Sequence, residues 1–325
     1  MDWNKASELV GQAQSILVLT HVRPDGDAIG SMTGLTHALR GMGKEVCMAV
    51  DGGVPAPLAF LPGSNEVSAQ LDNVAVDLVI AVDCGDESRM GQVGQVARRN
   101  GTPLVNLDHH RTNTMFGDAN LVDAETVAAA EGVLDWLDYM EIVPDPTVAF
   151  CLLTGIVTDT LCFRTDNVRD ATLGKAQRLM GAGASLIEIV QRTVSRSTYA
   201  GLRLLKEVLP SVNLENHVIW AVITSETYTA AEYPGTDDAG LVSTLVEIEE
   251  AYISAVFKAR NDGGIELGLR AVPGFDVSEV ALAFGGGGHK LASGATIYDV
   301  PLETLVPRVV EMLKAEAQKG QPLVK

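Results

Sequence analysis

Short apolar runs rich in branched residues alternate with amphipathic stretches over the first half of the chain. Each run has the length of one buried strand, and the runs lie at residues 15–22, 45–52, 74–85 and 103–110. Apolar positions at helical spacing predict an amphipathic helix at the N-terminus and further helices at 27–43, 87–100, 126–141, 147–158 and 170–181. This alternation is typical of a parallel sheet with helices on both faces.

The pattern changes after residues 185–209, which predict one continuous helix that Pro210 ends. Strands are then expected at 217–224, 251–260, 264–272 and 294–300, and helices at 239–250, 276–284 and 301–318. The sequence NDGG between the second and third of these strands is a hairpin signal. We therefore expect an α/β protein with an N-terminal parallel-sheet domain (1–190), a helical linker (191–212) and a smaller mixed α/β domain (213–325).

Composition narrows the class of protein. The 325 residues are 46% hydrophobic and 20% charged, as in ordinary globular chains, and the formal charge of −18 argues against binding to duplex nucleic acid. No apolar run has the length of a membrane span, and the N-terminus lacks the apolar core of a signal peptide. The four cysteines show no CxxC spacing, so we expect reduced, buried thiols in a cytoplasmic protein: Cys47, Cys84, Cys151 and Cys162.

The segment THVRPDGDAIGS, residues 20–31, places His21, Asp25 and Asp27 between a buried strand and a helix. In open parallel sheets ligands bind at this carboxyl end of the strands. A turn at Pro24-Asp25-Gly26 with Asp27 as helix cap is the simpler interpretation, but it leaves His21 and Asp25 unexplained.

Other acidic and histidine residues end the neighbouring elements. Asp83 ends the third apolar run, the triplet Asp108-His109-His110 ends the fourth, and Asp159 ends an apolar helix, where a carboxylate opposes the helix dipole. Capping of the next helix accounts for Asp86 better than for Asp83, and Cys84 is expected to pack on the opposite face of the strand. His37, inside a helix, and His217, at the start of a strand, are expected to be structural.

Together these side chains suit a pair of metal ions. Imidazole and carboxylate without thiolate favour Mn²⁺, Mg²⁺ or Fe²⁺ over structural zinc. Four aspartates and two histidines suffice for two ions that share a bridging carboxylate, and two such ions can clamp the attacking and leaving oxygens of a phosphoryl displacement.

A second unusual stretch is FGGGGHKLASGAT, residues 284–296, between a predicted helix and a predicted strand. Glycines allow close backbone approach, and successive N–H groups can form a cradle for an anion. His289 could donate to a phosphate oxygen, and Arg270 is either a phosphate or base ligand or a surface residue of its strand. A Walker-type phosphate loop is excluded because no GxxxxGK[ST] pattern occurs.

The ordered motifs THVRPDGDAIGS, AVDCGD, LDHH, GIVTDT and GGGGH make the chain similar to the DHH phosphoesterase superfamily, named for the triplet at residues 108–110. The resemblance extends over nearly the whole chain and is nearest to the nanoRNase/pAp phosphatase type. It implies two divalent cations, Mn²⁺ first with Mg²⁺ or Co²⁺ as alternatives, and an active site in a cleft between the two domains.

The resemblance also implies a role for each matched residue. One ion would be held by His21, Asp25 and Asp83, and the other by Asp27, Asp83, His109 and Asp159, with Asp83 bridging. Asp108 would orient the histidines, and His110 would face the scissile phosphate, so the catalytic residues would be Asp83, Asp108 and His110. Arg270, Gly286, Gly287 and His289 would bind the substrate. For Arg111 both a substrate contact and a solvent-facing position stay open, and no role is assigned to Arg164.

By this resemblance the chain hydrolyses short oligoribonucleotides, linear dinucleotides such as pApA and pGpG, and 3′-phosphoadenosine 5′-phosphate (pAp), in the cytoplasm and as a homodimer. A RecJ-like exonuclease is disfavoured by the short chain and its negative charge, and a family II pyrophosphatase by the GGGGH segment. A membrane-bound cyclic-dinucleotide phosphodiesterase would need spans that the sequence lacks. A non-catalytic nucleotide-binding protein would be expected to have lost ligands, and all of them are present.

Overall fold

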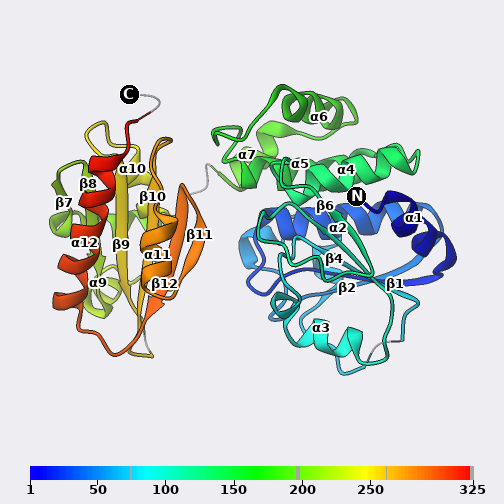
Figure 1. Ribbon diagram of the computed structural model, residues 1–325, viewed down its shortest axis with the longest axis horizontal. Coiled ribbons are helices and arrows are strands. Elements are labelled where there is room, and N and C mark those ends of the chain that lie inside the picture. The colour runs from blue at the N-terminus through cyan, green and yellow to red at the C-terminus, as the bar shows by residue number, and fades with distance from the viewer. Residues whose placement is uncertain (74, 195–197, 261, 323–325) are drawn as a thin grey trace. The chain divides into compact units, whose positions relative to one another are not determined.

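The computed structural model describes residues 1–73, 75–194, 198–260 and 262–322. The chain divides into two compact units, Met1–Arg196 and Ser197–Lys325 (Figure 1). Each unit has its own sheet and its own hydrophobic cores, and each is described by itself.

The N-terminal unit contains a six-stranded sheet in which every neighbouring pair is parallel, as the sequence predicted. The strand order is β3-β2-β1-β4-β5-β6. The strands are β1 (Ser15–Leu19), β2 (Glu45–Ala49), β3 (Val67–Ser68), β4 (Leu78–Val82), β5 (Leu104–Asp108) and β6 (Ala119–Val122). The two strands that the sequence did not reveal are β3 and β6, which are the edge strands and the shortest of the six.

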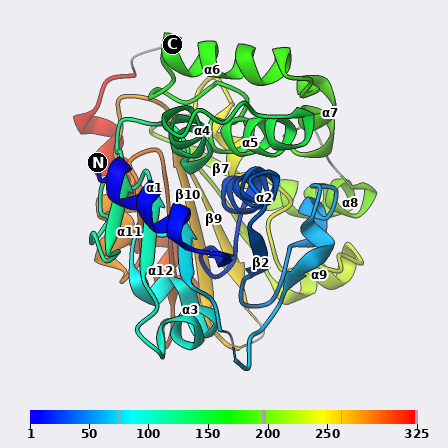
Figure 2. The ribbon, with the colours of Figure 1, turned by 90° about the vertical axis from the view of Figure 1, so that its right-hand side faces the viewer.

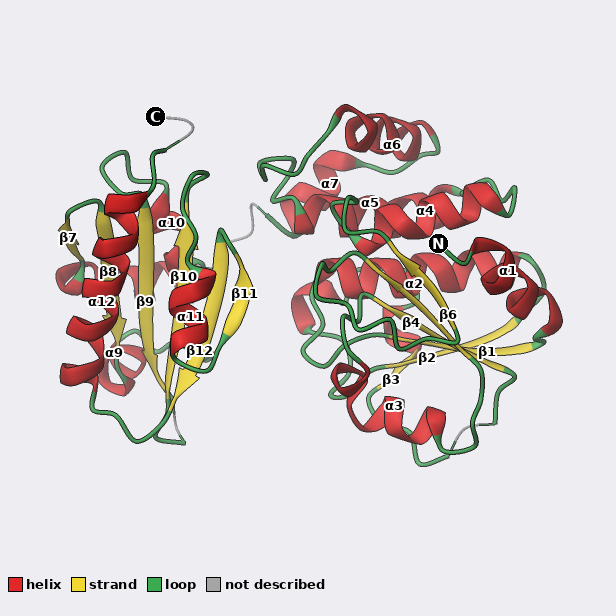
Figure 3. Ribbon diagram, in the orientation of Figure 1, coloured by secondary structure: helices red, strands yellow, loops and turns green. Residues whose placement is uncertain are grey.

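Helices cover both faces of this sheet, which confirms the expected fold class (Figure 3). Ile16 and Val18 of β1 pack with α1, α2, α4 and α5, whereas Leu17 and Leu19 point to the face covered by α3. Helices α6 and α7 pack on α5 as a further layer (Figure 2). The helices are α1 (Trp3–Gln12), α2 (Gly26–Gly41), α3 (Gly91–Arg98), α4 (Ala129–Tyr139), α5 (Pro146–Asp159), α6 (Asp170–Gly181) and α7 (Leu186–Arg192).

Glycines allow α2 and α5 to approach closely. A Cβ atom on Gly30 would lie 2.6 Å from the carbonyl oxygen of Cys151, and one on Gly34 would lie 2.8 Å from the Leu152 side chain. Gly26 faces Thr158 in the same way. Because later glycines of α2 meet earlier residues of α5, the two helices run in opposite directions. The C-terminus of α5 therefore lies against the N-terminus of α2.

One predicted helix is wrong. Residues 185–209 form two helices, α7 and α8 (Tyr199–Val208), instead of one. At Thr193 the backbone leaves the helical region, with φ −120° and ψ −85°, and the Thr198 hydroxyl caps α8 by accepting the N–H of Gly201. Residues 195–197, in the same predicted helix, lie outside the described residues. The predicted helix 87–100 is also divided, into the 3₁₀ turn η3 (Glu87–Met90) and α3.

The C-terminal unit contains a mixed six-stranded sheet in the order β11-β12-β10-β9-β8-β7, as expected for a mixed α/β unit. Within this sheet, the β8–β9 pair is the only parallel one among the described strands. The strands are β7 (Asn213–Glu215), β8 (Val218–Ile223), β9 (Ile253–Ala259), β10 (Ile265–Ala271), β11 (Gly287–His289) and β12 (Ala292–Ile297). Helices α8, α9 (Ser225–Ala230) and α10 (Leu241–Val246) contribute to one hydrophobic core of this unit. Helices α11 (Ser278–Ala283) and α12 (Leu302–Lys319) contribute to the other.

The cysteines are all free, but they are not all buried as predicted. Cys84 and Cys151 are buried, Cys162 is half-buried, and Cys47 is exposed because positions 45 and 47 of β2 face solvent. Among the described residues, we find no helix with the length and apolar character needed to cross a membrane.

Candidate metal centre

The predicted ligands of the N-terminal unit meet where the direction of the sheet's connections changes. Strands β1 and β4 are neighbours, but the chain leaves β1 for α2 on one face and leaves β4 for α3 on the other. Loops that diverge in this way leave a crevice at the carboxyl edge of a parallel sheet. His21 follows β1 and Asp83 follows β4 at this edge, so the fold explains why two distant motifs come together.

Asp83 lies among three histidines. Its Oδ2 is 3.3 Å from Nε2 of His21, and its Oδ1 is 3.6 Å both from Nε2 of His109 and from Nδ1 of His110. The residue is 2% exposed, and Oδ1 has no hydrogen-bond partner among the described residues. Its backbone has φ +57°, in the left-handed region that non-glycine residues rarely adopt. A buried carboxylate oxygen without a partner is costly, so this atom indicates a missing cation or donor.

Asp27 is held by the N-terminus of α4. Its Oδ2 accepts the N–H of Ala129 at 2.6 Å, and its Oδ1 accepts the N–H of Ala130 at 2.9 Å. The hydroxyl of Ser31 donates to the same Oδ1 at 3.1 Å. The glycine at position 155 allows α5 to pack closely against Asp27, since a Cβ atom there would lie 2.6 Å from Oδ1 of Asp27. A helix N-terminus stabilises a carboxylate, so α4 fixes the orientation of Asp27.

Asp25 caps α2, where the simpler interpretation of the sequence had expected Asp27. Its Oδ1 accepts the N–H groups of Asp27 and Ala28, both at 3.1 Å. Asp27 lies inside the first turn and points into the protein, whereas Asp25 is exposed. Asp86 caps η3 by accepting the N–H of Ser88 at 2.8 Å, which confirms its predicted role.

Asp159 is the last residue of α5, at the helix end that the sequence predicted. Its Oδ2 is 3.6 Å from Nε2 of His109, and Oδ2 of Asp27 is 3.9 Å from that nitrogen. Three carboxylates thus surround one imidazole nitrogen: those of Asp27, Asp83 and Asp159.

Asp108 contacts His110. Its Oδ1 lies 2.7 Å from Nδ1 of His110, and its Oδ2 accepts a hydrogen bond from Nδ2 of Asn113 at 2.6 Å. The same amide nitrogen of Asn113 also lies 2.9 Å from Oδ1 of the fully buried Asn106. Since the carboxylate accepts from Nδ1–H, the position of the His110 ring is fixed by a buried network.

The ligand atoms fall into overlapping groups. Within each group they lie within 4.8 Å of one another, and the groups are His21, Asp25 and Asp83; Asp27, His109 and Asp159; and Asp83, Asp108, His109 and His110. Asp83 and His109 each belong to two of them. Oxygen and imidazole donors without thiolate fit divalent cations such as Mn²⁺ and Mg²⁺, and the unpartnered Oδ1 of Asp83 supports that fit. These residues could therefore hold metal ions.

The pKa values show strong mutual repulsion of the carboxylates. Burial and the charges of Asp83 and Asp159 raise the pKa of Asp27 well above its usual range. Burial, with Asp83 and Asp25 adding to it, raises the pKa of Asp159 to about 7. A cation among them would remove this cost.

The histidines respond in the opposite sense. Burial works against the charge of His109, but the nearby carboxylates outweigh it and raise its pKa to about 10. The pKa of His21 is also raised, because Asp83 outweighs burial. For Asp83 burial is likewise outweighed, here by His109 and His21, and its pKa is lowered.

The predicted substrate residues lie in the C-terminal unit. Arg270 of β10 is opposite Ala292 of β12, which is opposite His289 of β11, so Arg270 and His289 lie in one cross-strand row. Burial lowers the pKa of Arg270. A Cβ atom on Gly286 would overlap the backbone of Gly294, whereas one on Gly287 would meet no atom within 4 Å. Gly286 is therefore required for packing, and the backbone at Gly287 is open.

Several residues around the centre were not singled out from the sequence. Nη2 of Arg89 lies 3.1 Å from Nδ1 of His21, and Asn106 and Asn113 lie behind Asp108. The second motif and the triplet pointed to their neighbourhoods, but their contacts depend on the fold. Arg111 is 82% exposed and lies 3.7 Å from Glu125.

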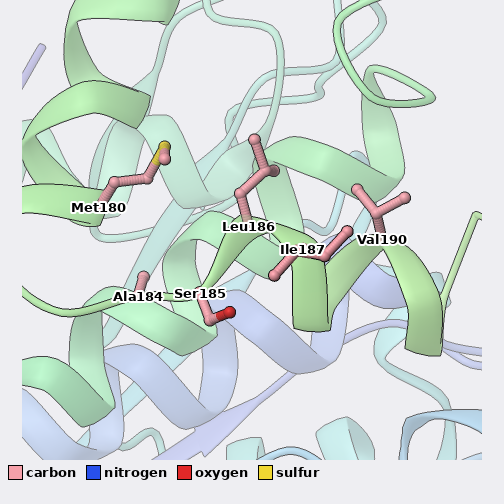
Figure 4. A pocket seen from close by; sticks show the side chains of 6 residues that line it. All are labelled: Met180, Ala184, Ser185, Leu186, Ile187 and Val190. Carbon is pink, nitrogen blue, oxygen red and sulfur yellow. The ribbon is translucent and has the colours of Figure 1, made fainter.

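A pocket of the N-terminal unit contains none of these residues. It is an apolar hollow of about 470 Å³ on α6 and α7, lined by Met180, Ala184, Ser185, Leu186, Ile187 and Val190 (Figure 4). Its lining has no titratable side chain, so it does not compete with the histidine–aspartate cluster as the site of chemistry.

The fold and the cluster define an α/β protein with a histidine–aspartate centre at the carboxyl edge of a parallel sheet, followed by a mixed α/β unit. The model of the DHH family, N-terminal domain, matches residues 15–156, and that of the DHHA1 domain matches residues 221–319. The bifunctional oligoribonuclease and PAP phosphatase NrnA of Thermus thermophilus is 33% identical over 310 residues, which cover 94% of this chain and 91% of the relative. The chain belongs to the DHH family.

Other relatives agree with this assignment. The protein of the same name from Bacillus subtilis is 28% identical, over 87% of this chain and 90% of the relative. An exopolyphosphatase-related protein from Bacteroides fragilis has the same fold, with a TM-score of 0.89, 23% identity and coverage of 98% of this chain and 97% of that one. RecJ of Thermus thermophilus in complex with Mn²⁺ has a TM-score of 0.58 at 17% identity, and this chain covers 55% of its length.

Proposed function

We propose that the protein is a metal-dependent phosphoesterase. It hydrolyses short oligoribonucleotides and linear dinucleotides such as pApA and pGpG, and it removes the 3′-phosphate of pAp, with nucleoside monophosphates as products. The similarity to bifunctional oligoribonuclease and PAP phosphatases over nearly the whole chain supports this substrate class. The observation that carries the proposal is that Oδ2 of Asp83 faces His21 while Oδ1 faces His109, which suits a carboxylate shared by two ions.

We propose two cation sites, with Mn²⁺ as the resident ion. One site consists of His21, Asp25 and Asp83, and the other of Asp27, Asp83, His109 and Asp159. When bound, such a pair of ions activates the attacking water and neutralises the charge that develops on the phosphate. The structure of RecJ with Mn²⁺, which has a similar fold, supports manganese as the ion.

The protein's own residues orient the reactants. Asp27 is fixed by the N–H groups of Ala129 and Ala130, so its carboxylate needs no rearrangement. Asp108 holds the His110 ring and would stabilise a positive charge on it. His110 would then donate to an oxygen of the scissile phosphate, which makes His110, Asp108 and Asp83 the proposed catalytic residues.

The proposed domain roles follow the predicted boundaries. Residues 1–190 bind the ions, residues 191–212 join the two parts, with α8 of this segment packed on a core of the C-terminal unit, and residues 213–325 bind the substrate through Arg270, Gly286, Gly287 and His289. The shared row of Arg270 and His289 supports this role, because two donors on one sheet face suit a phosphate-bearing ligand.

The four free thiols support a reducing compartment, and we propose the cytoplasm. A homodimer is proposed from the family resemblance alone.

The test compares the rates at which purified protein with Mn²⁺ hydrolyses different substrates. Initial rates are measured on pApA, a long single-stranded oligomer, pAp and pyrophosphate, each also with EDTA. The proposal expects metal-dependent turnover of pApA and pAp that exceeds turnover of the other two. Preference for the long oligomer would indicate a RecJ-like exonuclease, preference for pyrophosphate would indicate a pyrophosphatase, and nucleotide binding without turnover would indicate a non-catalytic protein.

A further inference from the structure

Arg89 occupies an unusual position beside a proposed metal ligand. It lies on η3, directly after the Asp83 motif, and its Nη2 is 3.1 Å from Nδ1 of His21. The backbone also joins the two segments, since the N–H of Val22 donates to the carbonyl oxygen of Arg89 at 2.8 Å. In the part of the chain that the structure describes, no carboxylate lies within ion-pair distance of Arg89, although the chain carries 42 acidic residues. Its polar contact is with the histidine.

That contact competes with another at the same nitrogen. Nδ1 of His21 also lies 3.0 Å from the carbonyl oxygen of Val22, which can only accept a hydrogen bond. A guanidinium can only donate. Nδ1 of a neutral imidazole therefore bonds to Val22 when it carries the proton, or to Arg89 when it does not.

The two arrangements differ in what Nε2 can do. If Nδ1 accepts from Arg89, the proton is on Nε2, which then donates to Oδ2 of Asp83 at 3.3 Å. If Nδ1–H donates to Val22, Nε2 presents a lone pair beside Asp83 and Asp25 and can bind a cation. Metal-bound histidines normally donate their other N–H to an acceptor, so an arginine at that nitrogen has the wrong polarity for a supporting partner.

We propose that Arg89 is a positioning residue that holds His21 in the tautomer unable to bind a cation, and so weakens cation binding by His21, Asp25 and Asp83. This role rests on the proposed function only in requiring that the group bind a cation. Arg89 would thus act in the opposite way to Asp108, whose carboxylate accepts a hydrogen bond from Nδ1 of His110. It also distinguishes the two proposed sites, because the groups that approach Nε2 of His109 are the carboxylates of Asp27, Asp83 and Asp159.

The first measurement is cation affinity without substrate. Wild-type protein, Arg89→Met and Arg99→Met are titrated with Mn²⁺ by calorimetry at pH 8. Arg99 is an exposed arginine at the end of α3, so its substitution removes the same charge without touching His21. Arg89→Met is expected to bind one of its Mn²⁺ ions about tenfold more tightly, as the loss of one competing charged hydrogen bond allows. Arg99→Met is expected to change the affinity less than threefold.

The second measurement reports the tautomer and does not depend on activity. Nitrogen-15 NMR of the metal-free proteins at pH 8.5, with the His21 signals assigned by comparison with His21→Asn, distinguishes a proton on Nε2 from one on Nδ1. The proposal expects the Nε2–H form in wild-type protein and a shift toward Nδ1–H in Arg89→Met. An Nδ1–H ring in the wild type would overturn it, as would a tautomer unchanged by Arg89→Met.

The two proposals fail in different ways. Wild-type protein that binds no Mn²⁺ would contradict the proposed metal site and the role of Arg89 with it. Normal Mn²⁺ binding with equal affinity in wild type and Arg89→Met would contradict the role of Arg89 alone.

Discussion

Nε2 of His109 lies 3.6 Å from Oδ2 of Asp159, which joins the end of β5 to the end of α5 in one small site. Asp27 and Asp83 also approach this nitrogen, at 3.9 and 3.6 Å. Without a bound cation, the positive charge of His109 offsets the charges of these carboxylates, while burial raises the pKa of Asp27 and of Asp159. The charged carboxylate of Asp159 is therefore needed to bind a cation, but it destabilises the metal-free protein.

Replacement of Asp159 by asparagine is expected to stabilise the metal-free protein and to abolish turnover. Above pH 7 the substitution removes a charge that its neighbours repel, so the melting temperature with EDTA should rise by roughly 2–4 °C, as about 1 kcal/mol gives in a domain of this size. Mn²⁺ should then raise the melting temperature less than it does in the wild type. Scanning calorimetry with EDTA and with Mn²⁺ measures both effects. A lower metal-free melting temperature together with full activity would show that Asp159 is not a ligand.

The stability of the metal-free protein should fall as pH rises. The folded-state pKa of His109, about 10, exceeds the ordinary value of 6.5, so its stabilising contribution is complete below about pH 6.5 and is lost as pH approaches 10. Asp159 has the same sign, since its pKa is raised from 3.8 to about 7 and its contribution is lost between about pH 4 and 7. We expect the melting temperature with EDTA to drop by at least about 5 °C between pH 6 and pH 9.

Saturating Mn²⁺ provides the control for this pH effect. Ligands bind the ion in their deprotonated forms, so the increase in melting temperature caused by Mn²⁺ should grow with pH over the same range. An increase that shrinks with pH would contradict the assignment of His109 and Asp159 as ligands.

Gly155 should be intolerant of a side chain, unlike another glycine inside a helix. A Cβ atom at Gly155 would lie 2.6 Å from both Oδ1 of Asp27 and Cβ of Ala130, whereas one at Gly174 in α6 would meet no atom within 4 Å. Gly155→Ala should lower the free energy of unfolding by about 1–3 kcal/mol and weaken Mn²⁺ binding. Gly174→Ala should raise the free energy of unfolding by roughly 0.5–1 kcal/mol, because alanine favours the helix. Urea unfolding of the two variants measures the difference, and equal effects would show that α5 does not pack tightly on Asp27.

Much of the N-terminal fold could be predicted from sequence because its signals are local. Strands such as SILVL have continuous apolar runs, and the carboxyl edge of a parallel sheet brings the residues after β1, β4 and β5 together whatever the loops between them. The position of Asp159 at the end of a helix was likewise local.

The errors concern features that spacing does not encode. Helical periodicity continues through residues 185–209, so the break at Thr193 has no signature in the pattern. Asp25 and Asp27 both stand where a cap is expected, and the choice between them depends on α4, whose N-terminus binds Asp27 from a distant part of the chain. Arg89 reaches His21 from a different motif, and β6, with four residues at the sheet edge, is too short to stand out.

Asp108 should matter for turnover more than for cation binding. Asp108→Asn keeps the shape of the side chain but removes the negative charge that accepts from Nδ1 of His110. If His110 donates to the phosphate, kcat on pApA should fall by roughly 10²–10⁴-fold, the range typical of a lost acid–base group. Mn²⁺ affinity should change less than threefold, which calorimetry can check. Unchanged kcat would exclude the Asp108–His110 pair from the chemistry, and loss of Mn²⁺ binding would make Asp108 a ligand instead.

The open backbone at Gly287 offers a test of the C-terminal unit that leaves its fold intact. Gly287 belongs to β11, where valine is a favourable residue, and a side chain there would meet no atom of the described structure within 4 Å. If the nucleotide lies against this backbone, Gly287→Val should raise KM for pApA at least tenfold and leave the melting temperature and Mn²⁺ affinity unchanged. Gly286→Val provides the contrast, because its side chain would overlap the backbone of Gly294 and should lower the melting temperature itself. Steady-state kinetics measure KM for Gly287→Val. An unchanged KM would show that β11 does not contact the substrate, and it would not contradict the proposed metal centre.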